Sequence, residues 1–179
     1  MSINYFGCLN VCEAFFPLLK SNAKVINIAS RLGLLCRLPS PELKQKILKI
    51  EKIEQLTQIV NEYIRACENG TNEKEGFPVT AYEMSKLALI YLTKLQQKLI
   101  NMDKTRKNIL IYSVCPGYCK TDLTKETGVI TPDEGADTPV YLIVNNNIPN
   151  SKGGEFWSSG KIVDWEHEQL DYYMSPSGF

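Results

Sequence analysis

The sequence predicts an α/β fold, in which short apolar strands alternate with helices. Two runs of β-branched and aliphatic residues, 24–30 and 108–114, have the length and composition of buried strands. Helical periodicity precedes the first run, fills the segment between the two, and returns after the second. A strand that follows one helix and precedes another is the pattern of an α/β protein.

Length and composition indicate one ordinary globular domain. The chain has 179 residues, which suits a single domain over 1–179, and 44% of them are hydrophobic and 22% charged. Twenty basic residues balance twenty acidic ones, so we expect no nucleic-acid partner and no anionic membrane surface. No apolar run approaches the roughly 20 residues that span a bilayer. The first twenty residues do not have the form of a signal peptide.

The cysteines predict reduced thiols rather than disulfides or a metal site. The six are Cys8, Cys12, Cys36, Cys67, Cys115 and Cys119. No secretory signal accompanies them, and neither the Cys8/Cys12 pair nor the Cys115/Cys119 pair has the spacing of a typical zinc or redox motif. We therefore expect no bound metal and a cytoplasmic protein.

Helical signals flank the first strand on both sides. Residues 3–20 show helical spacing of apolar side chains, and Pro17 is expected to kink or shorten the last turn. After the strand, Ser40-Pro41-Glu42 supplies a capping hydroxyl, a proline at the first helical position and an early acid. The signal runs to about Cys67, and Asn69-Gly70 ends it. We predict two helices in this charged segment, at about 40–70.

The next predicted helix, about 79–101, divides into two faces. Its expected apolar stripe consists of Ala81, Met84, Ala88, Leu92, Leu95 and Leu99. Tyr82 and Lys86 lie beside this stripe, where they can reach a cleft. Farther along, a helix opens at Pro132 and runs to Val144, and 153–157 has the form of a last strand. From about 165 to 179 we expect a loose tail.

Tyr82 and Lys86 are the first candidates for chemistry. Residues at positions i and i+4 of a helix share a face, so the phenol and the ammonium can act on one small molecule. A neighbouring cation favours the phenolate form of a tyrosine. Such a pair suits proton transfer to a carbonyl oxygen or from an alcohol. Taken alone, such a pair more often consists of ordinary surface residues on a solvated helix face.

Several short motifs occur in an order that carries more information than any one of them. They are Asn4-Tyr5-Phe6-Gly7, Ile26-Asn27-Ile28-Ala29-Ser30, Ser40-Pro41-Glu42-Leu43, Lys74-Glu75-Gly76-Phe77-Pro78, Ala81-Tyr82-x-x-Ser85-Lys86, Cys115-Pro116-Gly117-Tyr118 and Thr121-Asp122. This succession resembles the second half of a short-chain dehydrogenase/reductase, and more closely the cytosolic NADPH-dependent carbonyl reductases. The helical segment between Ser30 and Tyr82 is typical of the latter.

The resemblance implies a Rossmann-type doubly wound parallel sheet, with the helical segment inserted before the catalytic helix. It implies that Tyr82 protonates the substrate carbonyl while the nicotinamide delivers hydride to carbon. Lys86 would favour the phenolate and hold the nicotinamide ribose hydroxyls. Ser30 would hydrogen-bond the same carbonyl oxygen. Asn4 would bind a water that links the lysine to solvent.

The resemblance also implies a cofactor and a substrate site. The cofactor would be NADPH, held by Tyr82, Lys86, Pro116, Gly117, Tyr118, Cys119 and Thr121. The substrate would be a ketone, aldehyde or quinone, contacted by Ser30, Ala81, Tyr82 and Tyr118. The intact protein would be a monomer, because the segment from Ser40 to Asn69 would cover the surface used for dimerisation elsewhere.

Each assignment also has an ordinary structural interpretation. Asn4 can cap a helix, and Ser30 can be a turn residue at the end of a strand. Pro116-Gly117 marks a turn in any protein. His167, the only histidine, can simply be solvated.

The family's glycine-rich Thr-Gly-x-x-x-Gly-x-Gly motif, which binds the pyrophosphate, does not occur in this sequence. We therefore expect the C-terminal part of a carbonyl reductase, with an incomplete cofactor site. We also expect an unpaired sheet edge beside residues 24–29, where self-association is possible. The alternative is a non-enzymatic remnant that binds a partner or dimerises through that edge.

Overall fold

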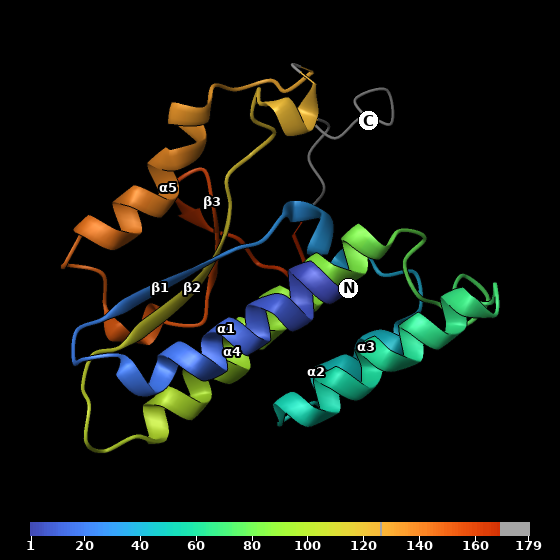
Figure 1. Cartoon of the computed structure of the whole chain (residues 1–179), viewed down its shortest axis with the longest axis horizontal. Helices are drawn as coiled ribbons and strands as arrows, with labels where there is room; N and C mark the ends of the chain where they lie inside the picture. Colours follow the sequence, from blue (N-terminus) through green and yellow to red (C-terminus); the bar gives the residue numbers. More distant parts are fainter. Residues whose placement is uncertain (126, 169–179) are drawn as a thin grey trace.

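The two strands predicted from the sequence pair in parallel at the centre of the fold (Figure 1). The computed structural model describes residues 1–125 and 127–168. Its sheet contains β1 (Lys24–Ile28), β2 (Leu110–Cys115), β3 (Phe156–Ser158) and β4 (Lys161–Ile162), in that spatial order. The first three strands are parallel, and β4 is antiparallel to β3. The predicted parallel α/β sheet is therefore confirmed.

Helices cover both faces of the sheet (Figure 1). On one face lie α1 (Cys8–Phe15), with a π-helical turn η1 (Ser2–Gly7) before it, and the long α4 (Ala81–Met102). On the other face lies α5 (Pro132–Val144), the helix predicted from Pro132. The first helix ends in a 3-10 turn, η2 (Phe16–Leu18), that contains Pro17, as expected for a proline that cannot continue an α-helix.

The charged segment forms two helices, as predicted. They are α2 (Pro41–Leu48) and α3 (Ile53–Glu68), and Ser40 caps α2 by accepting a hydrogen bond from the Leu43 amide at 3.1 Å. Together they form an outer layer against α4 (Figure 1). The Tyr91 hydroxyl of α4 donates a hydrogen bond, at 3.0 Å, to the carbonyl of Ile50, which lies in the turn between α2 and α3.

The stripe predicted on α4 is wrong at both ends. Ala81 and Leu99 are exposed, whereas side chains outside the stripe are buried. The additional buried residues are Ser85, Leu87, Leu89, Ile90, Tyr91, Thr93, Gln96 and Gln97. The reason is that α4 is enclosed by the sheet on one side and by α3 on another, so a single amphipathic stripe does not describe its surroundings. Asn27 of β1, for example, donates to Thr93 Oγ1 at 2.8 Å.

The C-terminal part also differs from the prediction. The last parallel strand is β3 at Phe156–Ser158 rather than 153–157, and it turns back into the short β4, which was not predicted. Trp165 is buried, and its ring packs on Tyr91 with centroids 5.5 Å apart. The chain is therefore packed at the position where a loose tail was expected to begin. Residues 169–179 of that tail lie outside the described part.

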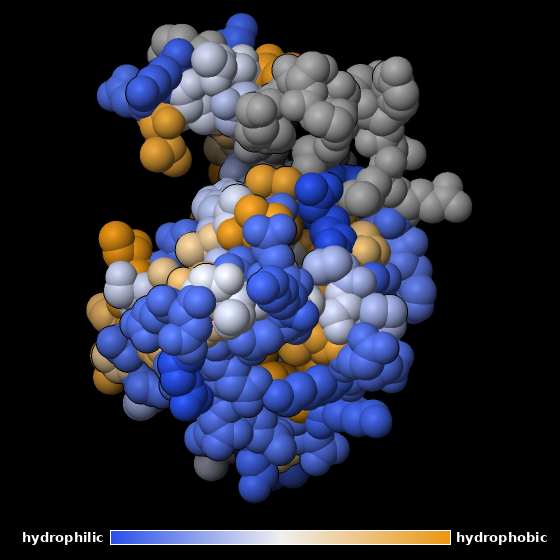
Figure 2. All heavy atoms as spheres, turned by 90° about the vertical axis from the view of Figure 1, so that its right-hand side faces the viewer, coloured by the Kyte–Doolittle hydropathy of each residue, from blue (hydrophilic) through white to orange (hydrophobic). Residues whose placement is uncertain are grey.

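The strand order leaves β1 at one edge of the sheet, as expected. Ile28 on this strand is 47% exposed. Figure 2 shows the side of the molecule on which α4 begins, and its surface is mostly hydrophilic, with apolar side chains in small groups. All six cysteines are free thiols. Among the described helices, none has both the length and the apolar character needed to cross a bilayer.

Candidate functional site

The first turn of α4 is fixed by reciprocal capping. Thr80 Oγ1 accepts a hydrogen bond from the Glu83 amide at 3.2 Å, and the Glu83 carboxylate accepts one from the Thr80 amide at 3.2 Å. This capping box sets the helix start immediately before Tyr82. Because α4 runs antiparallel to β1 and β2, Tyr82 and Lys86 lie at the carboxyl end of these strands, where α/β proteins bind ligands.

Lys86 is held at the end of β1. Its Nζ donates to the Ile28 carbonyl at 2.8 Å and lies 5.6 Å from the centroid of the Tyr82 ring. Burial lowers the pKa of Lys86 from its ordinary value, and the nearby Cys8 and Cys115 oppose that change. Tyr82 is 46% exposed. The predicted pair therefore shares one face, with the ammonium partly buried and the phenol open to solvent.

Ser30 lies two residues beyond Ile28. Its Oγ accepts a hydrogen bond from the Leu32 amide at 3.2 Å and caps the short 3-10 turn η3 (Arg31–Gly33). The structural interpretation of Ser30 as a strand-end residue is thus correct. This capping leaves the hydroxyl hydrogen available for donation, because a hydroxyl both accepts and donates.

Gly33 brings the loop that follows β1 and carries Ser30, here called the serine loop, against α4. The sequence alone did not predict this role of Gly33. A Cβ atom at this position would lie 2.4 Å from the Lys86 carbonyl carbon and 2.5 Å from the Leu87 nitrogen. Only glycine permits this close approach of two backbones. A lone glycine five residues after β1 gave no signal, because the reason for it is a tertiary contact. It places the loop that carries Ser30 beside the turn that carries Lys86.

Asn4 contacts the same helix, but not through Lys86. It lies in η1, and its Nδ2 donates to Ser85 Oγ at 3.1 Å. Ser85 Oγ in turn donates to the Tyr82 carbonyl at 2.8 Å. The water that Asn4 was expected to hold stays a prediction.

The predicted cofactor segment follows β2, the strand beside β1. Ile28 pairs with Val114, so Ser30 and Pro116 continue from neighbouring strands at the same end of the sheet. Gly117 has φ +87°, and a Cβ there would lie 2.6 Å from Ile130 Cδ1. The turn at Pro116-Gly117 therefore favours glycine because of its positive φ, whereas the Ile130 methyl group could move aside for a Cβ.

The residues that follow this turn are held by hydrogen bonds and packing contacts with other residues of the same loop and of the start of α5. The Tyr118 carbonyl accepts hydrogen bonds from Val129 and Ile130, and its hydroxyl pairs with Thr127 Oγ1 at 2.6 Å. The Cys119 sulfur sits where a side chain on Gly135 would be, 2.3 Å from the position of its Cβ. The Thr121 amide donates to Thr124 Oγ1 at 3.0 Å.

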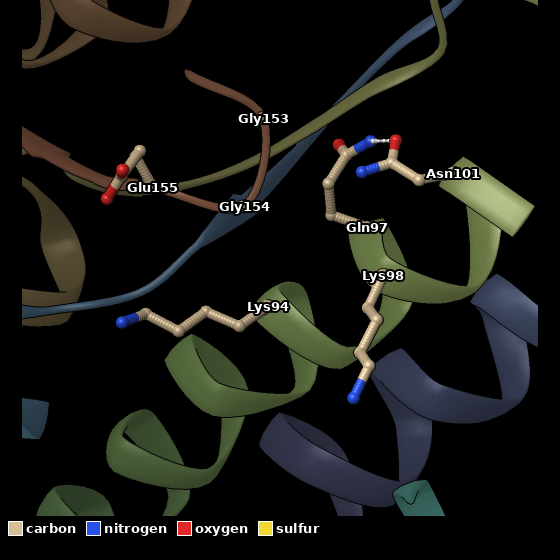
Figure 3. A pocket seen from close by; sticks show the side chains of 7 residues that line it. All are labelled: Lys94, Gln97, Lys98, Asn101, Gly153, Gly154 and Glu155. Carbon is tan, nitrogen blue, oxygen red and sulfur yellow. Dashed lines mark hydrogen bonds between the residues drawn. The ribbon is translucent and has the colours of Figure 1, made fainter. Parts of the chain in front are cut away.

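A cavity of about 330 Å³ lies elsewhere on α4 (Figure 3). It is lined by Lys94, Gln97, Lys98, Asn101, Gly153, Gly154 and Glu155. Lys94 is twelve residues beyond Tyr82, which is roughly 18 Å along a helix axis. Gln97 is bound to Asn101, Ile109 and Ile111, and the two lysine side chains point away from it. The cavity is therefore separate from the candidate site.

Comparison with curated proteins finds similar sequences, although no family model matches the chain. The chain is 32% identical to carbonyl reductase [NADPH] 1 of Rattus norvegicus, 33% to that of Bos taurus and 31% to that of Homo sapiens, each over 168 residues. These alignments cover 92% of the chain and 60% of each relative. The chain thus spans about three fifths of the length of the curated relatives it matches.

Solved structures share the fold. Salutaridine reductase from Papaver somniferum is similar with a TM-score of 0.75 and 25% identity, over 87% of this chain and 52% of that one. An NADPH-bound carbonyl reductase from chicken fatty liver is similar with a TM-score of 0.54 and 20% identity, over 90% of this chain and 54% of that one. The second likeness, at this identity, concerns the fold alone.

Proposed function

This chain belongs to the short-chain dehydrogenase/reductase family, and from that premise we propose that it is a carbonyl reductase, reducing ketones, aldehydes or quinones to alcohols with NADPH. The curated relatives are named as NADPH carbonyl reductases, and the chain spans only part of their length. The activity of this chain is therefore our proposal rather than a property read from those names.

One observation carries the proposal most directly: the Lys86 ammonium is fixed beside Tyr82 at the carboxyl end of β1. In this proposal Tyr82 gives its proton to the substrate carbonyl oxygen, and Lys86 stabilises the phenolate left behind. The hydroxyl hydrogen of Ser30 is directed at the same oxygen. Ala81 and Tyr118 line the substrate site, and Asn4 supports the lysine through a water.

The residues present fit part of a nicotinamide cofactor. An ammonium has three N–H donors, and the hydrogen bond to Ile28 uses one, so Lys86 retains donors for the ribose hydroxyls. Gly117 is exposed at the same end of the sheet. Pro116, Gly117, Tyr118 and Cys119 would seat the nicotinamide, and Thr121 would contact the carboxamide or pyrophosphate. NADPH, when bound, supplies the hydride.

The test has two parts. Binding is measured by titrating the full chain with NADPH and recording nicotinamide fluorescence. Activity is then measured as NADPH oxidation in the presence of acetophenone, benzaldehyde or menadione. We expect saturable binding and carbonyl-dependent oxidation, and loss of oxidation in Tyr82→Phe with binding retained. Saturable binding without oxidation of any substrate, or oxidation that survives in Tyr82→Phe, would falsify the proposal. The proposed cytoplasmic location is checked by fractionation of cells that express the chain.

The edge of the sheet supports a second candidate function. Among the described residues β1 pairs only with β2, and Ile28 on β1 is exposed. Parallel sheets are usually buried, so an apolar edge of this kind is a surface for association. The alternative is therefore a non-enzymatic chain that binds a partner or dimerises through β1. Sedimentation of the chain and of Ile28→Lys tests it: a dimer that Ile28→Lys dissociates supports the alternative, and a monomer at all concentrations rejects dimerisation.

A further inference from the structure

A buried hydroxyl lies between Tyr82 and Lys86 on α4. Ser85 is 1% exposed, and none of the roles expected for the site includes it. It donates to the Tyr82 carbonyl and accepts from Asn4. A hydroxyl has one hydrogen and a carbonyl can only accept, so Asn4 must present its NH₂ group to Ser85. The direction of both hydrogen bonds is thereby fixed.

The acceptor at the end of this chain of hydrogen bonds is the backbone of Tyr82 itself. In an α-helix the amide of residue i+4 donates to the carbonyl of residue i, so the Lys86 amide shares the Tyr82 carbonyl with Ser85. One oxygen atom therefore joins Ser85 to the backbones of both Tyr82 and Lys86. Asn4 connects this group to η1, an element separate from α4 in the sequence.

We propose that Ser85 is a positioning residue that, through Asn4, fixes the turn of α4 carrying Tyr82 and Lys86. Its hydroxyl is buried and bonded to Asn4 and the Tyr82 carbonyl, so the proposed role acts through Tyr82 and Lys86. The proposal rests on the proposed carbonyl reductase function for its kinetic consequence, but its structural consequence can be measured without activity. It also gives the Asn4 side chain a role in placing Tyr82, through the Ser85 hydroxyl.

The same helix contains a matched control. Thr93 is fully buried, its Oγ1 donates to the Leu89 carbonyl at 2.9 Å, and it accepts from Asn27 Nδ2 at 2.8 Å. An asparagine, a hydroxyl and a helix carbonyl are thus joined in the same way, away from Tyr82 and Lys86. If such hydroxyls serve only stability, removal of either one should have the same consequences.

The experiment compares Ser85→Ala with Thr93→Ala in the full chain. We expect similar losses in melting temperature for both variants. For Ser85→Ala we expect kcat to fall by about tenfold or more with KM within about twofold, because a small misplacement of the reacting group is costly. Thr93→Ala should keep kcat within about twofold of the unmodified chain, and Ser85→Thr, which restores the hydroxyl, should recover kcat.

Amide hydrogen exchange gives a readout that does not depend on activity. Ser85→Ala should speed exchange at residues 82–86 and leave residues 92–97 unchanged, and Thr93→Ala should do the reverse. Asn4→Ala should reproduce the effect of Ser85→Ala, and the double variant should be no worse than either single one. Asn4→Ala also keeps the test open if Ser85→Ala does not fold.

The outcomes separate the two proposals. An unmodified chain without NADPH oxidation rejects the carbonyl reductase function, and hydrogen exchange then decides the role of Ser85. Equal exchange profiles in Ser85→Ala and Thr93→Ala overturn the positioning role, as does an additive effect of the Asn4 and Ser85 substitutions. Equal losses of kcat in the two hydroxyl variants overturn it as well.

Discussion

A single absent side chain sets how closely the loop after β1 approaches α4. The atoms that a Cβ at Gly33 would meet belong to the backbone of Lys86 and Leu87, at 2.4–2.7 Å. Rotation of a side chain cannot relieve such an overlap, so the loop or the helix must move. Since the loop carries Ser30 and the helix carries Tyr82, that movement changes the spacing of the proposed catalytic groups.

Gly33→Ala should therefore lower both stability and activity. We expect a loss of about 1–3 kcal/mol in the free energy of unfolding, the usual range for overpacking, measured by urea denaturation. Gly7→Ala is the control, because a Cβ there meets only the Ser2 carbonyl oxygen at 3.3 Å. A Gly33→Ala variant as stable as Gly7→Ala would contradict the close approach.

The charge of Lys86 should make stability depend on alkaline pH. Burial lowers the pKa of Lys86 in the folded chain below the value of about 10.4 expected in the unfolded chain. Between the lowered pKa and the unfolded one, the unfolded chain binds more protons, so this residue's contribution to stability rises with pH. Below both values its contribution is constant and unfavourable.

Lys86→Met removes this component. The stability of the unmodified chain minus that of Lys86→Met should increase as pH rises from the lowered pKa of Lys86 towards about 10.4, measured by urea denaturation at a series of pH values. Lys94→Met, at a lysine whose pKa burial also lowers, provides the comparison away from the site. A difference that falls with pH for Lys86→Met would contradict the assigned sign.

At the scale of elements, the start of α4 decides where Tyr82 lies. The capping box of Thr80 and Glu83 has a counterpart on α5, where Thr131 and Glu134 make the same reciprocal hydrogen bonds. Both α4 and α5 therefore begin with a capping box, but only α4 carries Tyr82 and Lys86 of the candidate site.

Thr80→Ala and Thr131→Ala should each lower the free energy of unfolding by about 0.5–2 kcal/mol, the usual cost of a lost N-cap. Hydrogen exchange should separate them, because only Thr80→Ala is expected to loosen residues 81–86. The corresponding loosening in Thr131→Ala should fall on residues 133–137, because Pro132 has no amide hydrogen. Equal exchange at 81–86 in both variants would show that tertiary packing, rather than the cap, holds Tyr82 in place.

Local signals predicted the elements well and their surroundings poorly. Pro17, the Ser40 cap and Pro132 mark helix ends through backbone chemistry, which depends on neighbouring residues only. Ala81 and Leu99 were misplaced in the core because burial depends on what packs around α4. β4 has two residues and so offers no periodicity to detect.

The candidate site was likewise predicted where it depends on local sequence and missed where it depends on tertiary contacts. Tyr82 and Lys86 share a face, as their helical spacing indicated, and the order of strands brings Ser30 and Pro116 to the same end of the sheet. The contacts that set distances within the site were not visible in the sequence. Gly33 against Lys86 and Asn4 against Ser85 join residues far apart in the chain.

At the scale of the molecule, the C-terminal segment closes the fold around the serine loop. The Trp165 carbonyl accepts hydrogen bonds from the amides of Leu35 and Cys36, at 2.8 and 3.3 Å. Arg31, the residue after Ser30, pairs with Glu168 at 3.3 Å. The last described residues therefore hold the loop that follows β1, although they are the most distant from it in sequence.

Trp165 should be essential to this closure because of its ring. The indole packs on Tyr91 and lies 4.4 Å from Lys94 Nζ, while its N–H makes no hydrogen bond within the described residues. Trp165→Ala should lower the free energy of unfolding by about 3–5 kcal/mol and speed hydrogen exchange at 30–37. Trp165→Phe keeps a ring and gives up no hydrogen bond, so it should retain most of the stability. If Trp165→Ala unfolded at the same urea concentration as Trp165→Phe, the C-terminal segment would not stabilise the fold. The position of the serine loop would then depend on the contact between Gly33 and α4.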